Sequence, residues 1–440
     1  MIQTITNFLL NHTPLYYWTQ SLWRDEAFSV WIAQDSLSEV IRRTSGDFNP
    51  PLYYILLHFW MRIFGRSEVT LRGMSVVFFL LSLIVVYLLA KELFKSKFAA
   101  RTTTLLFAIN PMLDYFAFEL RMYSLLVFFT LLSMYFLYTK KWRYYVLTTI
   151  AGLYTQPFMG FVILAQAFYL LFTQQSRQLL KNSLVIGLLY LPWLPTLHAQ
   201  LRASGPMWMY PVDLNTVLSI LGNLYAGYEG TPGWAWPLMY LVSLLIVLIW
   251  IFLFKHVRKS ESKKVLQLLT IWVGLPLGFI LLISLVKPIY VHRYLIYVSA
   301  GMVFLISFFL TQIGKPRAKR TAFIIIAATL VLNLLAQSFH HKVPIRETFA
   351  TIAPLIKSHD VIYAETPLVY YESLYYAPPT TTVFLYNPHA ITPPRYVGEV
   401  GMPPKIWATR FPDFPARGFM IQEDGNFRIV SELSRESSAK

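Results

Sequence analysis

Apolar residues fall into ten runs, separated by short polar breaks. The runs cover roughly residues 73–90, 99–112, 122–138, 144–156, 158–173, 182–197, 236–254, 265–286, 293–312 and 321–338. A membrane-spanning helix needs ~17 to 25 mainly apolar residues, and several runs lie at the short end of that range. The long stretches of period-two alternation that are typical of outer-membrane barrels do not occur in the sequence. The pattern predicts a polytopic α-helical membrane protein with about ten transmembrane helices.

The two ends of the chain differ from this bundle. Residues 1–72 are interrupted by polar residues, and the short aromatic segment 51–65 is typical of a helix lying in a membrane interface. After about residue 340, helix-like and strand-like stretches alternate, which predicts a small α/β unit. The Pro-rich interval 388–415 reads as a loop. We therefore predict an outer N-terminal segment (1–72), a transmembrane bundle (73–338) and a soluble α/β domain (339–440).

Composition supports a membrane protein. The chain is 56% hydrophobic and 14% charged, with a mean hydropathy of +0.49, far from the values of soluble domains. Its net charge of +16 does not indicate a nucleic-acid partner, because Lys and Arg gather in the polar breaks of a lipid-embedded chain. The absence of cysteine excludes disulfides and thiolate metal sites.

The basic residues predict the topology. They cluster near residues 91–101, 140–143, 177–181, 255–264 and 315–320. The positive-inside rule makes these five breaks cytoplasmic, and the crossings then alternate without conflict. The ends of the chain and the loop 198–235 consequently lie outside, so the C-terminal domain is expected to be extracytoplasmic. The short loops and the absence of cysteine favour a bacterial plasma membrane.

The first candidate site is the motif Trp-Arg-Asp-Glu-Ala at residues 23–27. Two adjacent carboxylates near a membrane surface are costly unless they are exposed, paired or functional. Asp25 has the chemistry to accept a proton from a hydroxyl group as a general base, with Glu26 beside it. The alternative is a solvated loop with an ion pair to Arg24, and the local residues alone favour that alternative.

A second candidate surrounds two prolines. Pro50 and Pro51 fix the backbone, and Pro51 suits the first position of a helix. Asn49 would then lie at an electropositive helix N-terminus, where a phosphate binds well, with Asp47 in support. The alternative is that Asn49 only caps the helix.

The third candidate combines two distant segments. Arg121 lies at the outer end of a predicted helix, where its planar guanidinium can bind a phosphate. Arg293 lies at the outer start of another predicted helix and can bind a phosphate in the same way. We expect Glu119 and Tyr123 to share a helical face, and Tyr294 to accompany Arg293. A snorkelling Arg121 paired with Glu119 is an equally open reading.

Four motifs together carry a family resemblance. They are WRDEA, NPPLYY, FELRMYSL and HRYL, and they follow one another in this order on the predicted outer side. In order and spacing they resemble the GT-C glycosyltransferases of the dolichyl-phosphate-mannose protein mannosyltransferase type. The resemblance covers roughly the first 340 residues and is strongest over residues 20–160.

The resemblance implies an inverting glycosyltransferase that takes a sugar from a polyprenyl-phosphate carrier. Because polyprenyl phosphate is already a good leaving group, we expect no metal or cofactor. Asp25 would be the base, with Glu26 assisting, and Arg121 would bind the carrier phosphate. Further residues implied at the donor phosphate are Arg293 and Asn49, with Asp47, Glu119, Tyr123 and Tyr294 supporting. Many relatives carry His or Lys where Asn49 stands. The expected partners are this sugar donor, membrane lipid and a lipid, glycan or protein acceptor of unknown identity.

Two alternatives remain open from the sequence. A lipid or polysaccharide transporter would also need many helices and phosphate-binding arginines, although its ionisable residues would lie near the bilayer midplane. A catalytically inactive relative acting as a scaffold is the other alternative.

Overall fold

The computed structural model describes residues 10, 13–202, 209, 211–227, 233–337 and 340–432. The chain forms two compact units. The helical unit comprises Met1–Trp18, Arg72–Pro195 and Met209–His340, and the α/β unit comprises Thr19–Leu71, Thr196–Trp208 and His341–Lys440. The first seventy residues and the C-terminal residues, although far apart in sequence, thus belong largely to one unit.

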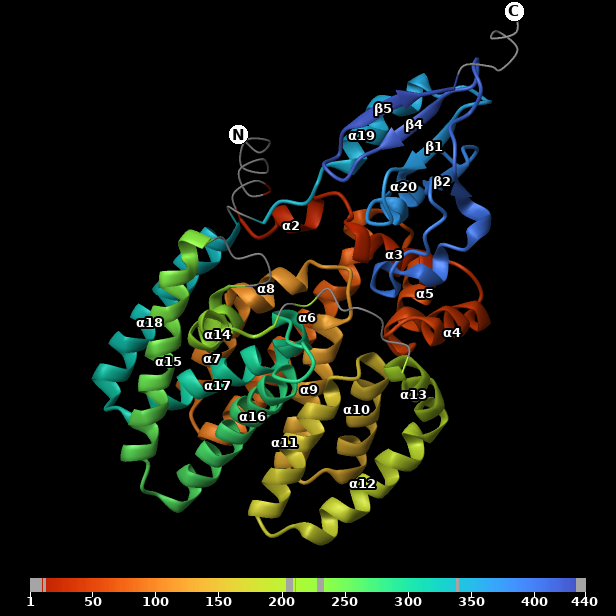
Figure 1. Cartoon of the computed structure of the whole chain (residues 1–440). Coiled ribbons are helices and arrows are strands. Elements are labelled where there is room, and N and C mark those ends of the chain that lie inside the picture. The colour runs from red at the N-terminus through yellow and green to blue at the C-terminus, as the bar shows by residue number, and fades with distance from the viewer. Residues whose placement is uncertain are drawn as a thin grey trace, which may run out of the picture. The chain divides into compact units, whose positions relative to one another are not determined.

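Long apolar helices build the helical unit (Figure 1). Its helices are α6 (Glu68–Phe94), α7 (Lys97–Ala108), α8 (Pro111–Ala117), α9 (Tyr123–Tyr138), α10 (Trp142–Thr155), α11 (Met159–Phe172), α12 (Ser176–Tyr190), α14 (Leu214–Ala226), α15 (Trp236–His256), α16 (Ser260–Ser284), α17 (Ile296–Gln312) and α18 (Lys315–Gln337). Short 3-10 turns η1 (Leu191–Trp193), η2 (Gly233–Ala235) and η3 (His292–Leu295) adjoin them. Helix α13 (Leu194–Arg202) follows η1, and most of it belongs to the α/β unit. Helix α17 is buried along almost its whole length and lies against several of the others, so it forms the centre of this unit.

Length and composition suit these helices to a membrane. Within the described ranges, six helical segments are long and apolar enough to cross a bilayer. They are Glu68–Phe94, Ser176–Arg202, Gly233–His256, Ser260–Ser284, His292–Gln312 and Lys315–Gln337, and shorter apolar helices accompany them. Every apolar run in the sequence overlaps a helix of the structure. The predicted fold class, a helical membrane bundle with a small C-terminal sheet region, is confirmed.

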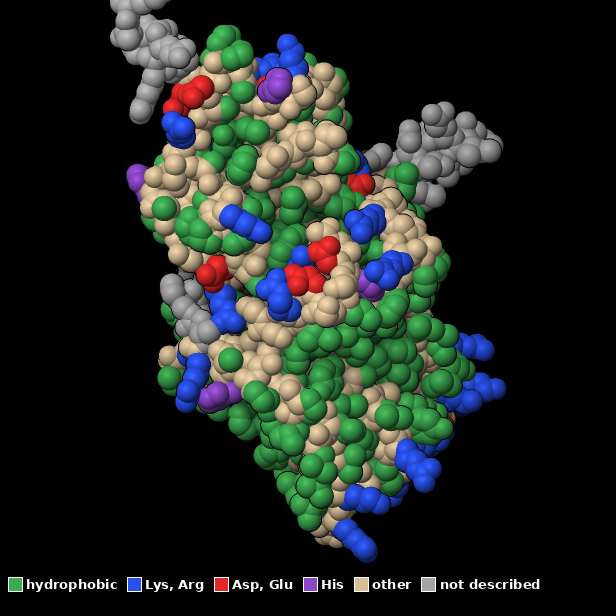
Figure 2. Space-filling view, turned by 90° about the vertical axis from the view of Figure 1, so that its right-hand side faces the viewer, with side chains coloured by type: hydrophobic (Ala, Val, Ile, Leu, Met, Phe, Trp, Pro, Cys, Tyr) green, Lys and Arg blue, Asp and Glu red, His purple; other side chains and the backbone are tan. Residues whose placement is uncertain are grey.

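Side-chain chemistry on the surface follows the same pattern. Apolar side chains of the spans are exposed, for example Leu184 at 63%, Leu188 at 59% and Phe323 at 73%. Figure 2 shows a broad hydrophobic surface in its lower part, with Lys and Arg side chains gathered along the lower right-hand edge. An exposed apolar surface of this breadth is suited to contact with lipid.

The five basic clusters surround short connections between helices. These connections join α6 to α7, α9 to α10, α11 to α12, α15 to α16 and α17 to α18. Ser96 illustrates the local chemistry, since its hydroxyl accepts from the Ala99 backbone N–H and caps α7. The loop expected at 198–235, part of which lies outside the described residues, contains helix α14. That part of the prediction is wrong, because polar residues interrupt the apolar pattern of α14.

The α/β unit begins with short helices. They are α2 (Tyr16–Thr19), which crosses the unit boundary, α3 (Arg24–Ala33), α4 (Leu37–Gly46) and α5 (Leu52–Phe64). The aromatic segment predicted as a helix over 51–65 is α5. Helix α3 packs against both α4 and α5.

A five-stranded sheet completes this unit. Its strands are β1 (Val361–Ala364), β2 (Val383–Tyr386), β3 (Trp407–Ala408), β4 (Gly418–Ile421) and β5 (Phe427–Val430), in the order β3-β2-β1-β4-β5. Only the β4–β5 pair is antiparallel, and β1 is central, with Ile362 opposite both Val383 and Phe419. Helices α19 (Ile345–Ile352) and α20 (Tyr370–Tyr376) adjoin the strands, with short 3-10 turns η4 to η7 between elements (Figure 1).

The interval 388–415, predicted as loop, contains β3 and three of these turns: η5 (Arg395–Val397), η6 (Glu399–Gly401) and η7 (Pro404–Ile406), while η4 (Ala353–Leu355) follows α19. The strand there is only two residues long, so it leaves almost no period in the sequence. The loop prediction holds for most of the interval and is wrong at Trp407 and Ala408.

Candidate functional site

The Asp-Glu motif opens helix α3 in the α/β unit. Asp25 and Glu26 both lie in its first turn, where the positive end of the helix dipole favours carboxylates. The Glu26 carboxylate also reaches back to the Trp23 backbone N–H at 3.3 Å, as in a capping box. The motif is therefore helical, and the reading of a solvated loop is wrong. The ion pair of that reading is present, because Arg24 Nε donates to Asp25 Oδ1 at 3.0 Å.

The two carboxylates differ in exposure. The Asp25 side chain is 15% exposed, whereas that of Glu26 is fully buried. Lys342 forms an ion pair with Glu26, with 2.9 Å between Nζ and Oε2, and its own side chain is only 8% exposed. A buried charge of this kind needs a partner, and Lys342 supplies it. Asp25 is consequently the more accessible of the two carboxylates, which suits it better to meet a substrate.

Lys342 is itself held in place. Its backbone N–H donates to the Gln20 side chain at 2.6 Å, just ahead of α3. The Ser21 hydroxyl donates to Glu347 of α19 at 3.1 Å and accepts from the Arg346 backbone N–H at 3.2 Å. The chain that enters α3 is thus tied to the segment that follows residue 341.

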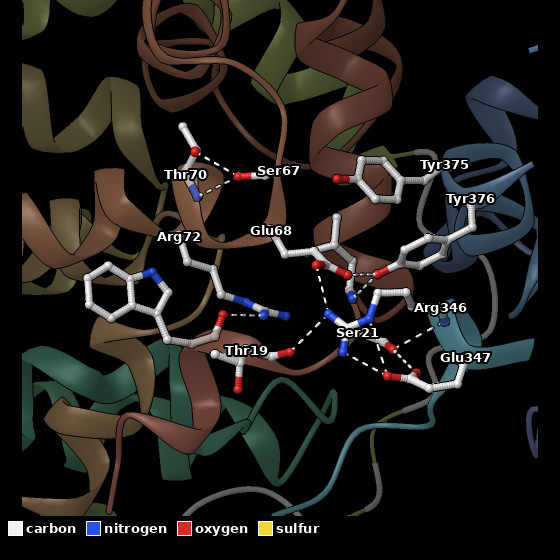
Figure 3. A network of polar contacts seen from close by, with 12 residues as sticks. Thr19, Ser21, Ser67, Glu68, Thr70, Arg72, Arg346, Glu347, Tyr375 and Tyr376 are labelled. Carbon is white, nitrogen blue, oxygen red and sulfur yellow. Dashed lines mark hydrogen bonds and ion pairs between the residues drawn. The ribbon is translucent and has the colours of Figure 1, made fainter. Parts of the chain in front are cut away.

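A network of polar contacts extends this connection (Figure 3). Arg346 binds Glu68 at 2.8 Å and Glu347 at 2.7 Å, and it also donates to the Thr19 carbonyl at 3.1 Å. The Tyr376 hydroxyl of α20 donates to the other Glu68 oxygen at 2.6 Å. One guanidinium therefore links α19, the start of α6 and the approach to α3.

Asp47 and Asn49 lie between α4 and α5. The Asn49 side-chain amide donates to the Asp47 carboxylate at 3.1 Å, and Asp47 is the C-cap of α4. Helix α5 begins at Leu52 with Pro51 as its N-cap. Asn49 therefore lies one residue further from the start of the helix than the sequence predicted. The expectation that Pro51 is the first helical residue is wrong by one position, since Pro51 is the N-cap of α5.

The helical unit contains the candidate cations. Arg121 and Arg293 are each only 8% exposed, although they come from segments more than 170 residues apart. Tyr123 lies within electrostatic reach of both guanidinium groups and also of Glu119 and Tyr294. The other four residues that the sequence singled out in these two segments therefore lie near Tyr123.

Local structure explains their positions. Arg121 lies in the bend between α8 and α9, where its backbone N–H donates to the Glu119 carbonyl at 2.8 Å. Arg293 lies in η3, and its guanidinium stands 5.9 Å from the ring centre of Tyr294. The expectation that Glu119 and Tyr123 share a helical face is wrong, because α9 begins only at Tyr123. They approach each other through the bend instead.

Within the residues that the structure describes, no group of three or more His, Asp or Glu side chains has the geometry to hold a metal ion. No sequence motif pointed to Lys342 as the partner of Glu26, or to Arg346 as a partner of the segment that enters α3. In the sequence, both residues lie just after the last apolar run, where a soluble segment begins, and no motif marks them.

Comparison with known proteins finds a family match over part of the chain and a fold shared with solved structures. Residues 49–197 match the sequence model described as dolichyl-phosphate-mannose-protein mannosyltransferase. ArnT from Cupriavidus metallidurans in the apo state aligns with a TM-score of 0.62 at 12% identity, over 96% of this chain and 91% of that chain. The structure of ArnT from the same organism bound to undecaprenyl phosphate gives 0.60 at 14% identity, over 95% and 93%. No curated protein matches the sequence.

At these identities the structural likeness shows the fold, and the family match covers about a third of the chain. The matched segment includes α5, the bend with Arg121 and the helices up to α12. The protein therefore shares the fold of ArnT, and its predicted resemblance to the dolichyl-phosphate-mannose protein mannosyltransferases is confirmed over residues 49–197.

Proposed function

We propose that the protein is an inverting glycosyltransferase that moves a sugar from a polyprenyl-phosphate carrier to an acceptor hydroxyl. The observation that carries the proposal is the convergence of Arg121 and Arg293 on Tyr123 in the helical unit. Two guanidinium groups bind a phosphate through planar, charge-assisted hydrogen bonds that a single lysine cannot reproduce. Their gathering within a membrane bundle favours a phosphate that is attached to a lipid.

The donor phosphate places a second demand on the protein. When the bond between the anomeric carbon and the phosphate oxygen breaks, the leaving polyprenyl phosphate gains negative charge. Buried cations that are already in position stabilise this charge without reorganisation at the moment of reaction. Arg121 and Arg293 would do this, and Tyr123, Tyr294 and Glu119 would hold them in place.

The acceptor side of the reaction needs a base. In the proposed step the acceptor hydroxyl oxygen attacks the anomeric carbon from the face opposite the phosphate, and its proton passes to Asp25. One such displacement inverts the anomeric configuration. Asp25 suits the role because it is partly exposed, whereas Glu26 is buried against Lys342 and would support the turn. Asn49 and Asp47, bonded to each other, would assist at the donor.

The distribution of basic residues indicates the side of the membrane on which sugar transfer would occur. With the five basic connections on the cytoplasmic side, the acceptor would receive its sugar on the extracytoplasmic face. The C-terminal domain would lie on the same side and help to select the acceptor. We propose a bacterial plasma membrane. The sugar and the class of acceptor, whether lipid, glycan or protein, are left open by this chemistry.

Mass spectrometry of lipids that co-purify in mild detergent tests the donor class. We expect a polyprenyl-phosphate sugar with the wild-type protein and its loss, by about tenfold or more, with Arg121→Ala, since a charge-assisted contact contributes ~1.5 to 3 kcal/mol. Arg101→Ala, at an exposed position of α7, is the matched control and should retain the lipid. Bulk phospholipid alone in all three preparations would contradict the proposal.

A further inference from the structure

The turn between α10 and α11 lies at the same end of the helical unit as Arg121. Helices α9 and α10 are joined by the short connection 139–141 and pack along each other (Figure 1). A connection of this length makes two packed helices antiparallel, so the end of α10 at Thr155 lies at the same end as the start of α9 at Tyr123. The turn that follows, residues 156–158, is therefore at the end of the bundle that carries Arg121.

A ring contact connects this turn with the segment of Arg293. The ring of Phe158 lies 4.8 Å from that of Tyr294, measured between centroids. Tyr294 in turn lies beside the Arg293 guanidinium, at 5.9 Å from its ring centre, and both are within electrostatic reach of Tyr123. The turn 156–158 is thus next to the arginines that we assign to the donor phosphate.

Gln156 is the first residue of this turn and is only 2% exposed. Its backbone is bonded on both sides, because its N–H donates to the Gly152 carbonyl at 3.0 Å and its carbonyl accepts from the Met159 N–H at 3.1 Å. Its side-chain amide oxygen is also buried, but has no hydrogen-bond partner among the residues that the structure describes. A buried acceptor without a donor destabilises the folded protein, so nearly all such groups in proteins have a partner.

Gln166 of α11 provides a comparison within the same bundle. It is fully buried, like Gln156, but its amide oxygen accepts from the Tyr145 hydroxyl at 3.1 Å. Its amide nitrogen donates to the Ser133 hydroxyl at 2.7 Å. The protein itself therefore satisfies both ends of Gln166, whereas the described residues supply no donor to the oxygen of Gln156.

The chemistry of the expected lipid decides which of its groups suits this oxygen. A phosphate diester offers acceptor oxygens and no proton to donate, so it suits the arginines, which only donate. A sugar hydroxyl carries a proton that it can donate, so it suits the amide oxygen of Gln156. The arginines and the glutamine are thus complementary to the two different parts of a polyprenyl-phosphate sugar.

We propose that Gln156 is a sugar-binding residue of the donor site, whose amide oxygen accepts a hydrogen bond from a hydroxyl group of the sugar on the carrier lipid. The inference rests on the proposed function, because it takes Arg121 and Arg293 as the phosphate site. It adds that the sugar lies beside the turn between α10 and α11. A buried group that only the right hydroxyl satisfies also discriminates against sugars that lack this hydroxyl.

Binding of defined lipids to the full chain in detergent tests this inference. The probes are undecaprenyl phosphate alone and undecaprenyl phosphate that carries glucose, galactose or mannose. We expect Gln156→Met to raise the dissociation constant of at least one sugar-bearing lipid by about three- to tenfold, the effect of one neutral hydrogen bond. The dissociation constant of the bare lipid should not change, because its phosphate contacts the arginines.

The two lipid classes also separate the inference from the proposed function. If Gln156→Met weakens no sugar-bearing lipid by more than it weakens the bare lipid, the inference is overturned and the phosphate site remains. If the wild-type protein binds neither the bare lipid nor any sugar-bearing lipid, the proposed function itself is overturned.

Gln166→Met is the matched control, because it removes a buried glutamine that is bonded within the protein. It deprives Tyr145 and Ser133 of a partner, so it should lower the melting temperature by a few degrees and leave the affinity for every lipid unchanged. Gln156→Met should melt at or above the wild-type temperature without added lipid, since it removes an unsatisfied buried oxygen. If it melts as low as Gln166→Met, the amide of Gln156 has a structural partner, and the inference is overturned.

Discussion

Replacing Lys342 with methionine tests the link between the Asp-Glu motif and the residues after 341. The Glu26 side chain is fully buried and that of Lys342 is 8% exposed, with 2.9 Å between their charged atoms. Removing one partner of a buried ion pair leaves an uncompensated charge and costs ~3 to 5 kcal/mol. The Trp23 backbone N–H, at 3.3 Å, would be a remaining contact of the Glu26 carboxylate.

This loss of folding free energy corresponds to a shift in the melting temperature. For a domain of 150 to 250 residues, 1 kcal/mol shifts the melting temperature by ~2 to 4 °C, so Lys342→Met should lower it by about 6 to 20 °C. Intrinsic tryptophan fluorescence of the protein in detergent, heated at one fixed rate, provides the assay. The double variant Glu26→Gln/Lys342→Met should recover most of the loss, because no buried charge is then left unpaired.

Lys264→Met is the matched control. Lys264 also pairs with a carboxylate, Glu261 at 3.1 Å, but the two side chains are 54% and 83% exposed. An exposed pair contributes ~0 to 1 kcal/mol, so this variant should melt within a few degrees of the wild type. The reasoning is refuted if Lys342→Met melts no lower than Lys264→Met, or if the double variant is as unstable as the single one.

Two further predictions concern the helical unit. Burial raises the pKa of Asp114 to about 7, against the effect of a hydrogen bond from Asn333, so the folded protein loses stability as pH rises from about 4 to about 7. The melting temperature of Asp114→Asn should therefore rise relative to that of the wild type between pH 5 and pH 8. A difference in melting temperature that does not change with pH would contradict this prediction. At Gly222 of α14 an added Cβ would lie 2.0 Å from the Met239 carbonyl oxygen, so Gly222→Ala should cost about 1 to 3 kcal/mol of stability through overpacking. An unchanged melting temperature for that variant would contradict the close packing of α14 on α15.

Hydrophobic periodicity predicted most of the helical unit, because a lipid solvent forces every spanning segment to be an apolar helix. It failed for α14, whose residues include Asn215 and Asn223 among apolar ones. The Asn223 side chain donates to Ser219 within the same helix, which a count of apolar residues cannot register. The C-terminal strands of four residues were predictable, but β3 was too short to leave a pattern.

The candidate site was predictable where its chemistry is local. Asp25, Glu26 and Arg121 stand in recognisable motifs, and Arg293 was singled out at the start of a second predicted helix. The role of Lys342 was not predictable, because it contacts α3 across more than 300 residues of sequence. Contacts of that range depend on the packing of helices, which no motif of a single segment records.

Sugar transfer itself is the most direct test of the account. The protein, reconstituted in liposomes with polyprenyl-phosphate sugars and an extract of envelope acceptors, should release polyprenyl phosphate and form a product with inverted anomeric configuration. Asp25→Asn should lower kcat by about 10²- to 10⁴-fold, as expected when a general base is removed, and should still bind the donor. Wild-type protein that binds such lipids but transfers no sugar from any of them would contradict the account.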